Sequence, residues 1–70
     1  MKKNIPKYKQ KLIETLKRVS TDKYFILNAV SAAGQNESDA QRVIDYIESE
    51  NPTEGEVTVF ALEMYYGSSS

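Results

Sequence analysis

The sequence predicts a small all-α protein, a bundle of three to four helices in one domain that spans residues 1–67. Apolar residues recur at intervals of three and four in successive segments, which is the spacing of one face of an α-helix. Residue types that favour helix starts and ends bound each of these segments. Residues 68–70, three consecutive serines, are expected to form a disordered tail.

The first helix is expected over about residues 6–20. Pro6 suits a first helical turn, because its φ is already helical and its missing N–H would have no partner there. Glu14 precedes Arg18 by four residues, a spacing that favours an ion pair on the exposed side. The apolar stripe that is expected to face the core consists of Ile5, Tyr8, Leu12, Leu16 and Val19.

The second helix is expected over residues 22–33, with its first turn capped by residues 20–22. Gly34 is predicted to end it in the left-handed conformation. This segment is apolar almost all round, which is typical of a helix packed on more than one side. Its main stripe consists of Ile26, Ala29, Val30 and Ala33.

A third helix is expected to begin at Asn36 or Ser38 and to end before Pro52, because proline disfavours a helical residue ahead of it. Thr53 and Glu56 have the spacing of a capping box, which predicts the start of a fourth helix that ends near Gly67. The inward stripe of the third helix consists of Ala40, Val43, Ile44 and Ile47.

An α+β fold is the alternative. Residues 23–30 and 56–65 are rich in β-branched and aromatic side chains, which favour strands. In that fold, the first helix and a helix near residues 37–50 would accompany two short strands near 23–30 and 56–65. We favour four helices, because an isolated two-stranded sheet is only marginally stable.

Charge is divided along the chain. Eight basic and two acidic residues lie in positions 1–23, a net charge of +6, whereas one basic and eight acidic residues lie in positions 24–70, a net charge of −7. The two halves can attract each other within one molecule or between molecules. The basic half can also bind phosphates in a weak, salt-sensitive and sequence-independent way. The candidate anion-binding or nucleic-acid-binding residues are Lys3, Lys7, Lys11 and Arg18.

Composition excludes several classes of chemistry. The chain has no cysteine and no histidine, so disulfides, thiolate nucleophiles, zinc–thiolate sites and histidine-based catalysis are all excluded. Its acidic residues lack the spacing of a metal-binding loop, and its three glycines are scattered singly. We therefore expect no enzymatic activity, no metal and no cofactor. With neither an export signal nor an apolar run near the roughly 20 residues that span a bilayer, a cytoplasmic location and no membrane partner are expected.

A helix-turn-helix is a further interpretation of the second and third segments, which meet at Gly34. The helix that would enter the DNA groove, residues 38–49, carries three acidic residues and only Arg42 as a basic one. This helix has a net negative charge and DNA is a polyanion, so the sequence disfavours direct reading of DNA by this helix.

The fourth segment has two apolar stripes. One, of Val57, Phe60, Ala61 and Met64, suits the core. The other, of Val59, Leu62 and Tyr66, lies on roughly the opposite side, where Tyr24 and Leu27 of the second helix could extend it. A second stripe either is buried inside a compact four-helix fold or forms a surface for a partner. The sequence thus predicts a small non-enzymatic interaction or regulatory domain that binds another protein or itself as a homodimer, with phosphate binding by the first helix as the alternative.

Overall fold

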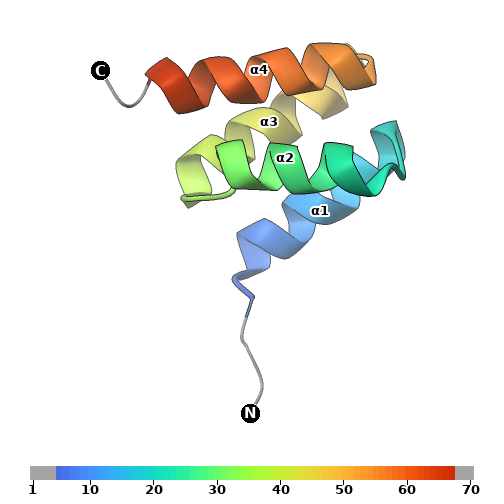
Figure 1. Ribbon diagram of the computed structural model, residues 1–70. Helices are drawn as coiled ribbons and strands as arrows, with labels where there is room; N and C mark the ends of the chain where they lie inside the picture. The colour runs from blue at the N-terminus through green and yellow to red at the C-terminus, as the bar shows by residue number, and fades with distance from the viewer. Residues whose placement is uncertain (1–4, 68–70) are drawn as a thin grey trace.

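The computed structural model describes residues 5–67 and contains four α-helices (Figure 1). They are α1 (Lys7–Val19), α2 (Lys23–Ala33), α3 (Glu37–Glu50) and α4 (Glu54–Gly67). Residues 23–30 and 56–65 are helical, and no strand occurs in the described part of the chain, so the α+β alternative is wrong. Phe25 and Val57 from these two segments are buried in the helical core, where tertiary packing overrides strand propensity.

Side-chain caps fix the starts of three helices. The carboxylate of Asp22 and the amide oxygen of Asn36 each accept a hydrogen bond from a backbone N–H in the first turn of α2 and α3. At α4, the Thr53 N–H donates to the Glu56 carboxylate at 2.9 Å, and the Glu56 N–H donates to the Thr53 hydroxyl at 3.3 Å. This reciprocal pair is the predicted capping box, and it starts a helix where the alternative required a strand.

The helices pack as two pairs, α1 with α3 and α2 with α4, and α2 also contacts α1 and α3 (Figure 1). The predicted inward stripe of α3 is buried throughout, and Val57 and Ala61 of α4 are buried as expected. Five of the twelve buried apolar residues are alanines, so small side chains make up much of the core. The buried set is Leu12, Leu16, Phe25, Ala29, Ala32, Ala33, Ala40, Val43, Ile44, Ile47, Val57 and Ala61.

Three details differ from the sequence-based expectation. Ile5, expected in the core, precedes α1 and is 48% exposed. Gly34 does not adopt the left-handed conformation, because its φ is −93°; Asn51, with a φ of 50°, is the residue that ends a helix in this way. Asparagine tolerates that region because its short polar side chain can form local hydrogen bonds. Arg18 forms an ion pair with Glu48 of α3 in place of the expected pair with Glu14.

Gly34 is required for a steric reason. A Cβ atom at this position would lie 2.5 Å from the carbonyl oxygen of Val30, which accepts a 2.7 Å hydrogen bond from the Gly34 N–H. We expect Gly34→Ala to lower the free energy of unfolding by about 1–2 kcal/mol, because the backbone must shift to relieve the overlap. Urea unfolding followed by circular dichroism measures this loss.

Gly55→Ala is the matched control. A Cβ atom at Gly55 would meet no atom within 4 Å, and the residue lies in the first turn of α4. Alanine there should raise the free energy of unfolding by about 0.5–1 kcal/mol, because it restricts the unfolded chain. If both substitutions changed the free energy of unfolding equally, a Cβ atom at position 34 would not be sterically excluded.

Candidate interaction surface

Many large apolar and aromatic side chains lie on the surface of this small protein. Within residues 5–67, seven are buried beside the five core alanines, seven more are partly buried against this core, and seven are exposed. All five residues of the predicted interface belong to the exposed set, so the second apolar stripe of α4 is not buried within the fold. The exposed set is Ile5, Tyr24, Leu27, Val59, Leu62, Tyr65 and Tyr66.

A groove of about 450 Å³ runs between α2 and α4. Its buried lining consists of small residues, Ala29, Ala32 and Ala61, because side chains of this size leave a hollow between two packed helices. Larger and polar side chains form the rest of its lining. These are Asn28, Ser31 and Gln35 from α2, and Thr58, Leu62, Tyr65 and Tyr66 from α4.

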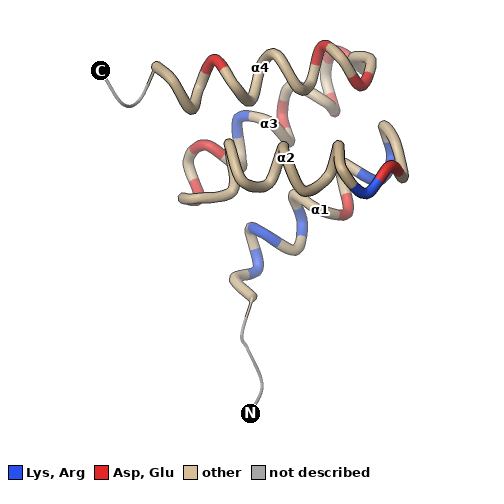
Figure 2. Tube along the Cα trace, in the orientation of Figure 1, with Lys and Arg blue, Asp and Glu red and all other residues tan. Residues whose placement is uncertain are grey.

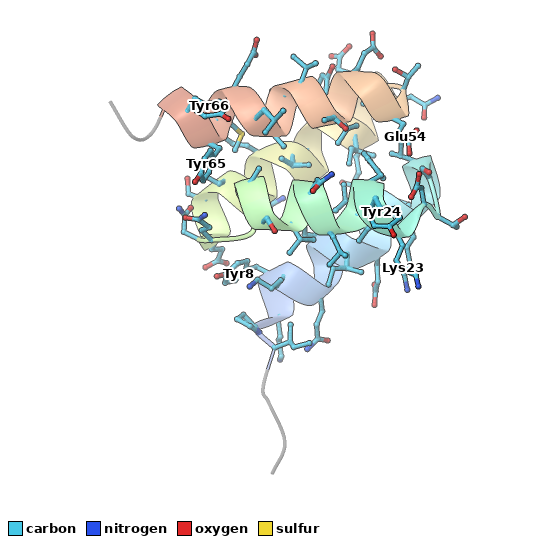
Figure 3. All side chains as sticks on the ribbon, in the orientation of Figure 1. Tyr8, Lys23, Tyr24, Glu54, Tyr65 and Tyr66 are labelled. Atoms are coloured by element: carbon cyan, nitrogen blue, oxygen red, sulfur yellow. The ribbon has the colours of Figure 1, made fainter. Side chains whose placement is uncertain are left out.

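The structure brings only part of the predicted interface to this groove. Leu62 and Tyr66 line it, whereas Val59 lines a separate hollow between α3 and α4, beside Phe60. Tyr24 is 75% exposed at the start of α2, at the opposite end of this face from Tyr66 (Figure 3). Leu27 is also exposed on α2 and does not belong to the lining.

Tyr65 is a groove residue that the sequence analysis missed. It lies on the helical wheel of α4 between the inward and outward stripes, four residues after Ala61 of one and three after Leu62 of the other. Its exposed fraction is 43%, and its ring meets the ring of Tyr66 edge to face with centroids 5.3 Å apart. The adjacent pair of tyrosines in the sequence was the available signal, since tyrosine is enriched at protein interfaces.

None of the charged side chains within residues 5–67 lines the groove. After Lys23, the helix α2 has no charged residue, and Figure 2 shows the rest of its length in tan, without blue or red positions. This is notable in a chain with nine basic and ten acidic residues. Fewer charged residues and more tyrosines distinguish the centre of a protein interface from ordinary protein surface.

The predicted phosphate-binding face is less continuous in the structure. Lys7 and Lys11 are exposed on α1, and Lys3 lies outside the described residues. Arg18 is held 3.6 Å from Glu48 of α3, an ion pair that joins the basic first helix to the acidic part of the chain. Both partners are largely exposed, so the pair contributes about 0–1 kcal/mol to stability.

The described residues contain neither a metal-binding group of side chains nor a membrane-spanning helix. Among residues 5–67, no three His, Cys, Asp or Glu side chains are grouped to hold a metal ion. No helix in this range has the length and apolar character needed to cross a membrane. The one buried polar side chain, Thr15, donates a hydrogen bond to the Lys11 carbonyl at 2.8 Å, and no buried side-chain polar atom in the described residues lacks a hydrogen bond.

Comparison with known proteins finds no protein-family model, no curated protein and no solved structure that matches this chain.

Proposed function

We propose that this protein is a small, non-enzymatic interaction domain that binds another polypeptide through the groove between α2 and α4. The exposed apolar side chains carry the proposal, because three of the seven in the described residues, Leu62, Tyr65 and Tyr66, line this one groove. Water-exposed apolar groups in one patch favour association, since contact with a partner removes them from water. A cytoplasmic role fits a chain without cysteine.

The chemistry of the groove defines the kind of partner. Small apolar residues at its base accept apolar side chains, and the absence of charge along its lining disfavours a strongly charged ligand. The amide of Asn28 can form hydrogen bonds with a ligand at its edge. A neutral apolar surface with a few polar groups is therefore the expected complement.

Site-specific photocrosslinking in cells tests this function. p-Benzoylphenylalanine in place of Tyr66, which is 66% exposed, should form a covalent adduct with a protein under ultraviolet light. The same amino acid in place of Gln41, an exposed residue of α3 outside the groove, is the control and should form little adduct. No adduct from position 66, or equal adducts from both positions, would contradict the proposal.

A second candidate function is phosphate binding by α1. The observation in its favour is the exposure of Lys7 and Lys11 on a helix with five basic residues and only Glu14 as an acidic one. Two phosphate contacts would make the affinity fall about tenfold between about 50 and 200 mM salt. A gel shift with duplex DNA at both salt concentrations tests it, and no shift at the lower one would end the idea.

A further inference from the structure

We infer that the polypeptide in the groove between α2 and α4 is a second copy of this chain, bound in a two-fold symmetric dimer. The inference rests on the proposed function, because it assigns the partner of the same groove. Three features support it: the shape of the face, its charge, and the small size of the core.

The shape of the face suits binding to itself. A two-fold interface uses the same patch on both molecules, so that patch must contain both a hollow and a projection that fits it. The buried alanines Ala29 and Ala32 form the hollow, and the exposed side chains of Leu62 and Tyr66 stand along its edge. In such a dimer, the edge of each molecule would occupy the hollow of the other.

The charge of the face also suits a second copy. Residues near a two-fold axis lie opposite their own copies, so a charged lining would repel itself, and this groove has no charged lining.

The exposed area of the face approaches that of a standard dimer interface. A standard interface buries about 800 Å² of each partner, and a tyrosine contributes about 150–250 Å² when it is fully buried. With exposed fractions of 75%, 43% and 66%, Tyr24, Tyr65 and Tyr66 together offer roughly half of that area. Leu62 and the polar lining of the groove supply much of the remainder.

The small core means that dimerisation would stabilise the folded chain. Five of its twelve residues are alanines, and a chain without cysteine has no disulfide to compensate. Domains of this length commonly gain stability from oligomerisation, because a single small core is marginal. The thermal midpoint of unfolding should therefore rise with protein concentration.

Sedimentation velocity on the full chain tests the dimer. Over about 1–500 µM, a range that covers weak and moderate affinities, the wild type should approach twice the 7.9 kDa mass of one chain. Leu62→Glu and Ser31→Arg each place a charge in the groove, and each should weaken the dimer by about 100-fold or more. Ser31 is exposed, so its substitution removes no core contact and keeps the test valid if Leu62→Glu fails to fold.

Matched controls lie on the same two helices. Val59→Glu on α4 and Leu27→Arg on α2 introduce the same charges at exposed apolar positions outside the groove, and each should change the dissociation constant by less than about threefold. Circular dichroism should show that all four variants remain helical. If Val59→Glu weakens the dimer as much as Leu62→Glu, the groove is not the interface.

The two proposals fail in different ways. A wild type that stays monomeric over the whole concentration range overturns the dimer. If photocrosslinking from position 66 then captures a different protein, the interaction function stands with another partner. If it captures none, both proposals fail. Both proposals are supported if the adduct has twice the mass of one chain and the dimer in solution is weakened by the substitutions in the groove.

Discussion

Leu16→Ala should leave most of the protein unfolded at room temperature. Leu16 is completely buried in α1, and truncation of a buried leucine costs about 2–5 kcal/mol through lost burial and the cavity that remains. A domain of this size rarely has more than about 3–5 kcal/mol of stability in total. The helical signal in circular dichroism should therefore fall sharply. Any remaining unfolding transition should start from zero urea, without a plateau of folded protein at low urea concentration.

The control for this substitution is Ile5→Ala. It also shortens an aliphatic residue near the first helix, but Ile5 is about half exposed and precedes α1. Its effect should stay within about 0.5 kcal/mol, as for most surface substitutions. A similar loss from both variants would place Ile5 in the core, as the sequence alone suggested, and would contradict the structure.

Ala40→Leu should destabilise the fold by about 1–3 kcal/mol, although it adds apolar surface to the core. Ala40 is fully buried in α3, and protein interiors are close-packed, so three more carbon atoms find little room there. Gln41→Leu, at the adjacent exposed position, should change stability by less than about 0.5 kcal/mol. Urea titrations of both variants measure the difference.

A stabilising effect of Ala40→Leu would show that the core has unfilled space. In that case the balance between buried and exposed apolar residues would reflect loose packing instead of a surface built for a partner. This substitution therefore bears on the stability of the fold and also on the reason for the exposed aromatic face.

Local signals in the sequence were enough to predict the helices. The capping box of Thr53 and Glu56, the cap at Asn36 and the stop before Pro52 all act within a few residues, and the structure confirms each of them. The error at Gly34 has the same local origin, since glycine permits the left-handed region without requiring it. Periodicity likewise separated the buried Val57 from the exposed Val59.

The groove depended on the tertiary structure. From the sequence, Val59, Leu62 and Tyr66 form one stripe of a single helix, and nothing in their spacing indicates which of them lies beside another helix. The pairing of α2 with α4 decides this, because it places Leu62 and Tyr66 next to the small residues of α2 and leaves Val59 on the side of α3.

The sequence by itself thus determined the helical segments, their caps and the presence of an apolar excess, because these follow from periodicity and from contacts over a few residues. Only the tertiary structure decided which members of that excess share one uncharged groove, and that the basic first helix meets the acidic third helix through Arg18 and Glu48. Both depend on which helices pack together, which is set by the fit of their side chains in three dimensions.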